Sequence, residues 1–452
     1  MMSNKLLKFT IKILSFTLIL AFIYVGLTAY ALAYEFPDYV KVGLRYGNTA
    51  VNFASIDGEK GLKSGMIEGT AFIQSSDLKG NKSVSAQVVD GRILIEDLNG
   101  NIIESVEANT IYCLMASDSE EGGILKFNNA PYRGGIVLQI NSEGKITVIN
   151  RLGVEAYLYG VLNQEMSQSS PLEALKAQAI AARNFIAIRM GTHEKDGFDV
   201  CTTTHCQVYK GFGGEYPKTN QAVDETAYLM MFSQGIPVQA YYHKNSGGHT
   251  ENSENVWYTT LPYLRGVLDP YSPIYPWSAN LSKDNIQSLL SAGGYDIGAV
   301  QEVLIKRKTQ AGSVLNLEIK GEQGNVLLEK EKIRSVLGFT VIKSLNFQMT
   351  NSNEKILSLQ SSDKLESATG EISILSAEGS SKQVSIMDIY ATNGVDLIKM
   401  QNDGIPQDDF TFSGFGYGHR LGMSQDGAIV MANQGMGFEK ILKFYYENIE
   451  IR

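Results

Sequence analysis

The sequence predicts a mixed α+β protein with a β-rich N-terminal region. From Tyr39 to about Asn150, short apolar or alternating runs are separated by Gly, Asn, Asp and Ser, a pattern typical of strands joined by turns. Helical periodicity begins only afterwards, in two consecutive segments over 154–166 and 171–190. The 452-residue chain, 44% hydrophobic and 19% charged, is long enough for two or three domains with hydrophobic cores.

Residues 1–35 predict export of the remainder of the chain. Lys5, Lys8 and Lys12 precede an apolar run from Ile13 that continues to Ala33. Positive charge before such a run stays in the cytoplasm, so the chain after it is expected outside the cytoplasmic membrane. The run is long enough to span a bilayer, whereas residues 31–33 (Ala-Leu-Ala) resemble a signal-peptidase site. An uncleaved membrane anchor and a cleaved signal peptide both remain open.

The overall charge argues against a nucleic-acid partner. The formal net charge is -9 at pH 7, whereas nucleic-acid-binding proteins concentrate basic residues on one face to neutralise phosphates. A neutral or mixed-charge partner fits the composition better.

Local signals divide the exported part further. Residues 36–145 form the β-rich domain, and a hairpin is expected around 141–144 at its end. The helix over 171–190 is expected to begin at Pro171, with Ser170 as its cap and Glu173 completing a capping box. Short helices are expected over 331–337, 425–433 and 438–446, with Ser424 as a cap, and 351–409 reads as a small β-rich insertion.

Glu165 is the first candidate for chemistry. On a helix it shares a face with Leu158, Val161 and Leu162, so a carboxyl group continues an apolar stripe at the helix C-terminal end. Partial desolvation and the negative end of the helix dipole would both raise its pKa and favour an acid able to donate a proton. An ordinary solvated glutamate at a helix end is the competing interpretation.

A short polar segment gathers four possible metal ligands, two imidazoles and two thiols. This set suits tetrahedral zinc, and four protein ligands would make the site structural. The adjacent pair His205-Cys206 does not match common zinc-finger spacing, and a disulfide between the two cysteines is the alternative in an exported protein. The candidate ligands are His193, Cys201, His205 and Cys206.

Two glycine-containing segments are candidates for substrate contact. The first, 242–250, holds Ser246, Gly247 and His249 around a Gly-Gly turn, and it is either a polar turn or a loop lining a substrate, with Trp257 and Tyr258 nearby as surfaces for sugar rings. The second, 414–428, has glycines dense enough for close backbone approach. It lacks the spacing of a Walker or Rossmann phosphate loop, so by itself it predicts a tight loop before a helix.

Several motifs occur in order along the chain. Glu165-Met166 is followed by 170–183, then by Gln207-Val208-Tyr209, Ser246-Gly247-Gly248 and 416–425. This ordered set resembles the stage II sporulation protein D / LytB (SpoIID/LytB) family, from about Ile146 to the C-terminus. The resemblance implies a SpoIID/LytB-like core in two parts, 146–350 and 410–452, interrupted by the β-rich insertion.

The resemblance implies a peptidoglycan lytic transglycosylase that cleaves MurNAc-GlcNAc β-1,4 bonds, in the best-known members on glycan stripped of its stem peptides. Glu165 takes the place of the catalytic acid and base, and no cofactor is required for the reaction. Because the C6 hydroxyl of muramic acid is the nucleophile and a 1,6-anhydro sugar is the product, one carboxyl group suffices where a hydrolase uses two. The family motifs add these candidates for the substrate cleft: Tyr209, His419, Ser424 and Gln425.

Two other functions fit parts of the pattern. Some LytB-type proteins are non-catalytic wall-binding enhancers of a separate amidase, and such a protein would tolerate glutamine in place of Glu165. A metallohydrolase using the cysteine and histidine cluster would need an open coordination position, against which four protein ligands count. The expected partners are peptidoglycan glycan strands, the cytoplasmic membrane through the N-terminal segment, and a wall amidase.

Overall fold

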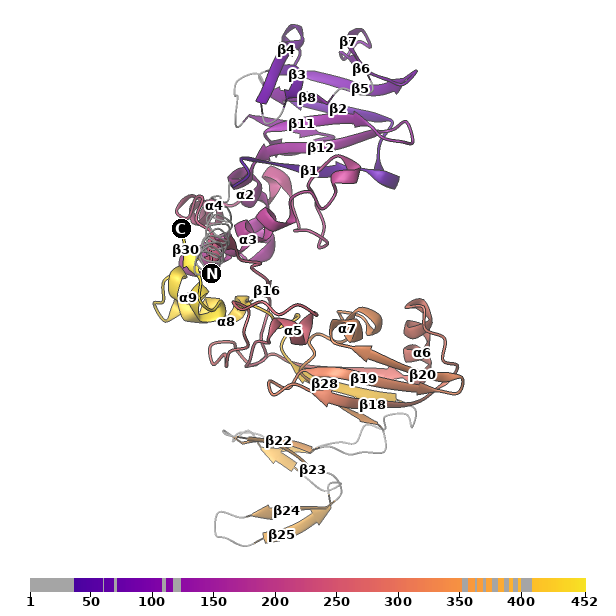
Figure 1. The fold of residues 1–452 in the computed structure, drawn as a ribbon, viewed down its shortest axis with the longest axis vertical. Coiled ribbons are helices and arrows are strands. Elements are labelled where there is room, and N and C mark those ends of the chain that lie inside the picture. Colours follow the sequence, from indigo (N-terminus) through magenta and orange to yellow (C-terminus); the bar gives the residue numbers. More distant parts are fainter. Residues whose placement is uncertain are drawn as a thin grey trace, which may run out of the picture. The chain divides into compact units, whose positions relative to one another are not determined.

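The computed structural model describes residues 36–452 except residue 60 and the ranges 69–70, 108–110, 117–122, 352–356, 362–363, 369–370, 376–380, 386–389, 393–396 and 400–408. The expected signal segment therefore lies outside the described residues. The chain divides into two compact units, Met1–Ala240 with Asn448–Arg452 (unit 1) and Tyr241–Glu447 (unit 2) (Figure 1). The mixed α+β prediction is confirmed, with a β-rich N-terminal part. In the described part, no helix combines the length and the apolar character needed to cross a bilayer.

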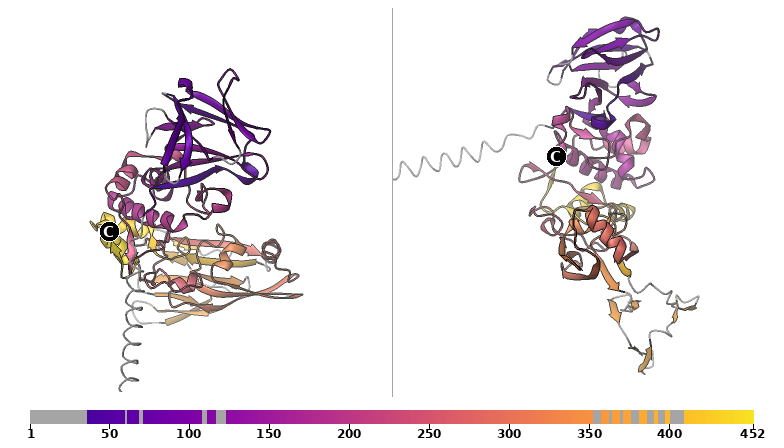
Figure 2. Two further views of the ribbon diagram at one scale, coloured as in Figure 1. Left: turned by 45° about the horizontal axis from the view of Figure 1, so that its top comes forward. Right: turned by 90° about the vertical axis from the view of Figure 1, so that its right-hand side faces the viewer.

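Two sheets make up the N-terminal part of unit 1. They pack through β11 against β6 and β9, and through β8 against β9 (Figure 2). Alternating residues point into the shared core, as in β2, where Ala54 and Ile56 are fully buried. The first sheet has the order β13 (Val200–Cys201), β1 (Tyr39–Arg45), β12 (Ile146–Gly153), β11 (Gly135–Ile140), β8 (Tyr112–Ala116), β3 (Leu62–Glu68), β4 (Ala71–Ser76). The second has the order β10 (Ala130–Arg133), β9 (Ile124–Phe127), β2 (Phe53–Gly58), β5 (Ser83–Val89), β6 (Arg92–Glu96), β7 (Ile102–Glu107).

The predicted hairpin around residues 141–144 is confirmed. Strands β11 and β12 pair antiparallel from Gly135 opposite Arg151 to Ile140 opposite Ile146. The Asn141 side chain closes the turn by accepting hydrogen bonds from the backbone N–H groups of Glu143 and Lys145. Strand β12 then runs directly into the first described helix.

Helices α2 (Val154–Glu165), α3 (Leu172–Arg189) and α4 (Pro217–Asp224) pack on one another below the sheets (Figure 1). Twelve of the residues of α3 are buried, because its alanines allow neighbouring elements to approach closely. The chain end returns to unit 1, where β14 (Met231–Ser233) pairs with both β15 (Ile236–Pro237) and β30 (Glu450–Ile451).

The expected cap of α3 is wrong. Pro171 has extended backbone angles, φ -57° and ψ 146°, and is itself the residue before the first helical turn, with no side chain accepting from that turn. Ser170 instead lies in a preceding turn in which its N–H donates to the carbonyl of Ser167, and Glu173 pairs with Lys176. A helix start moves by one residue when the proline takes the extended conformation rather than the helical one.

Unit 2 is organised around a second core. Two three-stranded sheets and two helices share this core. The first sheet has the order β17 (Pro276–Ser282), β28 (Asp409–Phe415), β21 (Phe347–Asn351), and the second has the order β18 (Val300–Lys308), β19 (Val314–Gly321), β20 (Gly324–Glu329). The helices are α6 (Lys283–Ala292) and α7 (Glu331–Leu337). The remaining elements are α5 (Ser253–Val256), α8 (Gln425–Asn433), α9 (Phe438–Tyr445) and the parallel pair β16 (Tyr242–His243) and β29 (Met423–Ser424).

Several local predictions in unit 2 hold. The helix over 331–337 and the helix over 425–433 have the predicted bounds, and the Ser424 hydroxyl caps α8 by accepting from the N–H of Gly427 at 3.2 Å. The segment 351–409 contains three strand pairs: β22 (Leu357–Ser361) with β23 (Lys364–Ala368), β24 (Glu371–Leu375) with β25 (Ser381–Ser385), and β26 (Tyr390–Thr392) with β27 (Leu397–Lys399).

A buried ion pair joins α2 to α3. The fully buried guanidinium of Arg183 donates two hydrogen bonds to the Glu155 carboxylate, at 2.7 and 2.6 Å, and a third to the carbonyl of Leu229 at 3.0 Å. Glu155 is 18% exposed at its side chain, so the pair is largely shielded from water.

Replacing Arg183 by methionine is expected to lower the free energy of unfolding of unit 1 by about 3–5 kcal/mol, because Glu155 would keep a shielded charge without a partner. The matched control is Arg92→Met in the exposed pair with Glu107, where a change below about 1 kcal/mol is expected. Urea unfolding followed by circular dichroism measures both. Equal losses in the two variants would show that the Arg183 pair contributes no more than a surface pair.

Candidate functional site

Glu165 is the last residue of α2. The three residues that share its face, Leu158, Val161 and Leu162, are fully buried, whereas Glu165 is partly exposed. The chain turns away immediately, because the next residue, Met166, has extended backbone angles and is buried. The carboxyl group therefore lies where a buried helix face meets the surface of unit 1.

Tyr157 connects Glu165 to the motif Gln207-Val208-Tyr209. Its hydroxyl donates to the Gln207 side-chain oxygen at 3.2 Å, and its ring stacks on Tyr209 with centroids 5.1 Å apart. Burial first, and then the neighbouring groups Cys206, Tyr209 and Glu165, raise the pKa of Tyr157 well above its ordinary value. Groups at the end of α2, in this loop and in the cysteine cluster therefore all lie close enough to Tyr157 to affect the pKa of its hydroxyl.

Tyr209 is an interior residue. It is 4% exposed, and its hydroxyl donates to the Asn150 side-chain oxygen at 2.7 Å. The Asn150 amide in turn donates to the carbonyls of Arg133 and Gly135. The ring lies close to α2 because residue 160 is glycine: a Cβ there would lie 2.6 Å from the Tyr209 ring. In this structure Tyr209 supports the loop from within.

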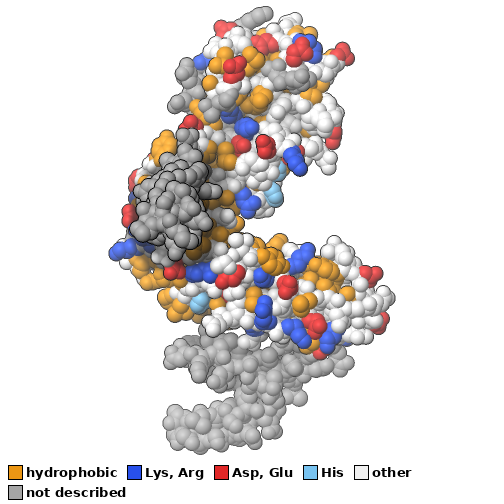
Figure 3. Space-filling view, in the orientation of Figure 1, with side chains coloured by type: hydrophobic (Ala, Val, Ile, Leu, Met, Phe, Trp, Pro, Cys, Tyr) orange, Lys and Arg blue, Asp and Glu red, His pale blue; other side chains and the backbone are white. Residues whose placement is uncertain are grey.

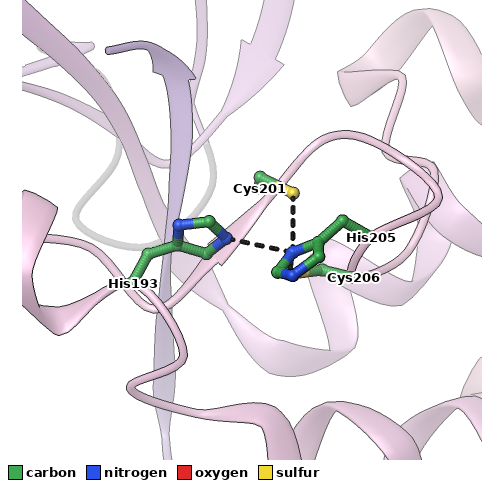
Figure 4. Close-up of side chains that lie close together, drawn as sticks. All are labelled: His193, Cys201, His205 and Cys206. Carbon is green, nitrogen blue, oxygen red and sulfur yellow. Dashed lines mark hydrogen bonds between the residues drawn. The ribbon is translucent and has the colours of Figure 1, made fainter. Parts of the chain in front are cut away.

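The four predicted metal ligands come together in unit 1 (Figure 4). Their ligand atoms all lie within 4.8 Å of one another. From His205 Nδ1, the distances are 3.3 Å to His193 Nε2, 3.8 Å to Cys201 Sγ and 3.5 Å to Cys206 Sγ. Tetrahedral zinc with ordinary Zn–S and Zn–N bonds places neighbouring ligand atoms about 3.3–3.8 Å apart. The three distances from His205 Nδ1 fall in this range, while the whole set of four ligand atoms extends over 4.8 Å, and neither cysteine is in a disulfide.

Neighbouring groups orient these donors. His193 Nδ1 lies 3.3 Å from the Asp196 carboxylate, so Nε2 is left to face the cluster, and the imidazole stacks on Phe198 at 4.8 Å. A carboxylate behind a histidine is the usual support of a metal ligand. On the other side, the Thr203 hydroxyl lies 3.3 Å from Cys201 Sγ. Burial and the adjacent Cys201 raise the pKa of Tyr46.

The two thiols differ in ionisation. Burial opposes ionisation of Cys201, but hydrogen bonds from Thr203, His205 and Cys206 outweigh it and lower the pKa of this thiol to about 6. Burial, together with the neighbouring Cys201, raises the pKa of Cys206 to about 11. At neutral pH the cluster therefore holds one thiolate and one thiol, and a cation would be needed to ionise the second.

The predicted binding loops of unit 2 are held by a buried network around Asp269. The Asp269 carboxylate accepts hydrogen bonds from the Ser246 hydroxyl at 2.8 Å and from the Tyr445 hydroxyl at 3.1 Å. The Ser424 hydroxyl lies 3.4 Å from the Ser272 hydroxyl. Ser246 and Ser424 are fully buried, and burial raises the pKa of Asp269. These serines fix the shape of the loops from inside.

Arg420 locks the same loops together. It is 1% exposed, donates to the carbonyls of Ser246, His249 and Ala311, and hydrogen-bonds the hydroxyl of Ser313. Its backbone has a left-handed φ of 65°. A buried guanidinium that spans several carbonyls gives a rigid loop, because moving any one segment leaves a buried donor without a partner.

Other predicted residues of unit 2 lie nearer the surface. Gly247, His249 and His419 are partly exposed, whereas Gln425 is 8% exposed at the start of α8. The imidazole of His419 lies 5.3 Å from the Trp257 ring and 6.2 Å from the Tyr241 ring, and its Nδ1 accepts from the N–H of Leu421. Desolvation by the packed rings and then the nearby Arg334 lower the pKa of His419, which favours the neutral imidazole.

Sequence reasoning missed the residues that hold these sites. Tyr157, Asn150, Asp269 and Tyr445 carry buried hydrogen bonds, but each occurs in an ordinary strand, helix or turn pattern. The one available signal was the Asp269-Pro270 pair, which marks a turn.

Comparison with known proteins defines the class. Residues 142–232 match the model of the stage II sporulation protein (SpoIID) family, and residues 250–363 match a domain of unknown function, DUF8618. The chain is 30% identical over 329 residues to an uncharacterised protein of Brachyspira hyodysenteriae, covering 72% of this chain and 73% of that protein.

Two named relatives are also similar. The amidase enhancer of Bacillus subtilis is 31% identical over 293 residues. The matched region covers 64% of this chain and 39% of the enhancer's length. Stage II sporulation protein D of Bacillus amyloliquefaciens is 27% identical over 324 residues, 67% of this chain and 75% of that protein. The chain belongs to the SpoIID/LytB family of cell-wall proteins, as its ordered motifs predicted.

Tyr209→Phe is expected to cost about 1–3 kcal/mol of stability, because it leaves the buried Asn150 oxygen without its donor. Any glycan-cleaving activity of the chain, measured at a temperature well below unfolding, should change little, since the phenol is interior. Thermal unfolding and product release, measured on the same preparation, separate the two effects. A large loss of cleavage at unchanged stability would instead mean that Tyr209 contacts substrate.

Proposed function

We propose that this chain is a lytic transglycosylase that cleaves MurNAc-GlcNAc β-1,4 bonds of peptidoglycan glycan strands, with Glu165 as acid and base. The observation that carries the proposal is the place of Glu165, partly exposed at the end of a helix whose adjoining face is buried. The family to which the chain belongs supports the reaction class.

The proposed reaction uses Glu165 twice. As an acid it protonates the glycosidic oxygen that leaves C1 of muramic acid. As a carboxylate it then accepts the proton of the C6 hydroxyl, whose oxygen forms the new bond to C1 and closes the 1,6-anhydro ring. The glutamate ends the cycle protonated, and an intramolecular nucleophile takes the place of an activated water.

We assign the candidate substrate residues of unit 2 to two roles. Gly247, His249 and His419 are partly exposed and are proposed to contact the glycan. Ser246 and Ser424, which are fully buried, and Gln425, which is 8% exposed, are proposed to hold the loops in shape, as Tyr209 does in unit 1.

Glu165→Gln is expected to keep the fold and to lower release of 1,6-anhydro products at least about a thousandfold, because the amide neither donates nor accepts the required proton. Glu143→Gln, at an exposed turn glutamate paired with Lys145, is the control and should retain activity. Sacculi digested with and without prior amidase treatment, analysed by mass, give the product and the preferred glycan. An active Glu165→Gln variant would end the assignment.

A non-catalytic role as an amidase enhancer is the second candidate, favoured by the 31% identity to the Bacillus subtilis protein of that name. The same variant distinguishes the two. An enhancer with Glu165→Gln would still stimulate a purified wall amidase to the full extent, whereas a transglycosylase would lose its products.

We further propose that His193, Cys201, His205 and Cys206 hold a structural zinc ion. The spacing of the four donors and the carboxylate behind His193 support it. When bound, zinc would neutralise both thiolates and tie the 193–206 segment to β1 through β13, with no part in the bond cleavage.

Zinc binding to the reduced, metal-free chain is expected to release about one proton at pH 7.5. Cys201, with a pKa of about 6, is already ionised at that pH, whereas Cys206, with a pKa of about 11, must give up its proton. Apparent affinity should therefore fall about tenfold per pH unit down to pH 6 and more steeply below it. Calorimetric titration in buffers of different ionisation enthalpy measures the released proton.

Two variants complete this test. Cys206→Ser should weaken zinc binding by at least about a hundredfold, because a thiolate ligand is lost. Cys113→Ala, which removes the isolated buried thiol of β8, should bind zinc like the unaltered chain. Equal zinc contents in the Cys206→Ser and unaltered chains would refute the site.

The remaining proposals concern location. The chain is expected to act outside the cytoplasmic membrane, anchored through residues 1–35 or released to the wall, in company with a wall amidase. Fractionation of cells that express the full chain, with sequencing of the N-terminus, tells an anchor from a cleaved signal.

A further inference from the structure

Aromatic rings gather on unit 2 around Trp257. The Trp257 ring lies 4.4 Å from that of Tyr241 and 5.3 Å from that of His419, at interplanar angles of 47° and 51°. All three side chains are partly exposed, and Tyr258 beside them is 75% exposed. The rings are tilted relative to one another, so they form a ring cluster rather than a parallel stack.

Lys330 contacts both Tyr258 and the backbone of Trp257. Its ammonium lies 4.1 Å from the centre of the Tyr258 ring and donates to the Trp257 carbonyl at 3.1 Å. A cation over an aromatic face is attracted by the ring, so the lysine orders an otherwise exposed tyrosine. An ammonium has three N–H donors and can therefore bind a further acceptor while holding Trp257.

The backbone of Lys330 is held in an unfavourable conformation. Its φ of 50° and ψ of -136° lie in a region that residues with side chains rarely adopt. Its N–H donates to Leu315 at 2.9 Å and its carbonyl accepts from Ile333 at 3.0 Å, so both sides are fixed. Such strain persists only where the surroundings impose it, and it concentrates at ligand sites.

Nearby charges leave the lysine available to an anion. The adjacent Glu331 carboxylate is engaged by Arg334 at 2.9 Å. His419 is neutral and adds no charge of its own. On the face drawn in Figure 3, hydrophobic, basic and acidic side chains are interspersed over unit 2. An apolar ring surface beside an ammonium matches a sugar that carries a carboxylate.

We propose that Tyr241, Trp257, Tyr258 and His419 form a sugar-binding platform on unit 2, and that Lys330 binds a carboxylate attached to the bound muramic acid. This inference rests on the proposed glycan substrate and assigns a role to part of the matched domain of unknown function, residues 250–363. Apolar faces of pyranose rings pack on tryptophan and tyrosine, and the ammonium distinguishes muramic acid from an uncharged N-acetyl sugar. The carboxylate belongs either to the lactyl group of a stripped glycan or to a stem peptide.

Binding measured in the Glu165→Gln background tests the platform independently of cleavage. The full chain is titrated with three probes: glycan strands stripped of peptides, peptide-bearing strands, and chitohexaose, which lacks carboxylates. Trp257→Phe and Tyr258→Ala are expected to weaken binding of all three. Lys330→Met is expected to weaken binding of the probes with carboxylates by about tenfold more than binding of chitohexaose, since it removes a charged hydrogen bond in addition to the contact with Tyr258. Loss for the stripped strands alone identifies the lactyl group, and loss for the peptide-bearing strands alone identifies the peptide.

Matched variants guard against misfolding. Lys332→Met alters an exposed lysine two residues further along, in α7, and should bind like the background. Lys330→Gly relieves the unfavourable backbone angle, so it should fold and still lose carboxylate recognition. Tryptophan fluorescence adds a direct readout, because glycan should shift the emission in the background but not after Trp257→Phe, where buried Trp277 remains.

Unchanged binding in Tyr258→Ala and Trp257→Phe would overturn the platform. An equal loss of chitohexaose binding in Lys330→Met would overturn the carboxylate assignment, because the lysine would then act only by holding Tyr258. If the proposed enzymatic function is wrong, the unaltered chain with Glu165 releases no anhydro products from sacculi, a result that does not depend on these binding measurements.

Discussion

Tyr209 packs flat against Tyr157 and close to α2 because residue 160 is glycine, and the candidate site of unit 1 depends on this contact. The packed rings bring Gln207 to the Tyr157 hydroxyl and place the cysteine cluster beside the same helix. The Asn150 amide secures the far side of the stack by hydrogen bonds to β-sheet carbonyls. A partly exposed glutamate thus ends a helix whose adjoining face is buried.

Charged groups lie near α2 in two places, in the Arg183–Glu155 pair and in the cysteine cluster. Arg183 and Glu155 tie α2 to α3 in the interior, where both charges are satisfied by each other and by a carbonyl. The cysteine cluster is different, because it holds one thiolate and one thiol that ionises only with difficulty. Four donors of which both cysteines are buried are a suitable environment for a divalent cation, and the proposed zinc ion would stabilise the segment that leads into Gln207.

Unit 2 combines rigid loops with an exposed aromatic surface. Arg420 and the network around Asp269 fix the glycine-containing loops from inside, so the serines of the family motifs act as supports. The aromatic cluster beside them combines the motif residue His419 with Trp257, Tyr258 and Lys330 from outside the motifs. Buried motif residues such as Ser246 and Ser424 shape the backbone here, while the proposed glycan contacts are partly exposed side chains from inside and outside the motifs.

Sequence patterns alone predicted the α+β class, the hairpin at residues 141–144, several helix bounds, the family and the four residues that meet in the cysteine and histidine cluster. These features follow from local periodicity, turn chemistry and ordered motifs, which are visible along a single chain. The start of α3 escaped prediction because Pro171 adopts an extended rather than a helical conformation. Only the tertiary structure decided that Tyr209, Ser246 and Ser424 are interior and that Lys330 lies against Tyr258, since burial and contacts between distant segments depend on how the chain packs and not on spacing.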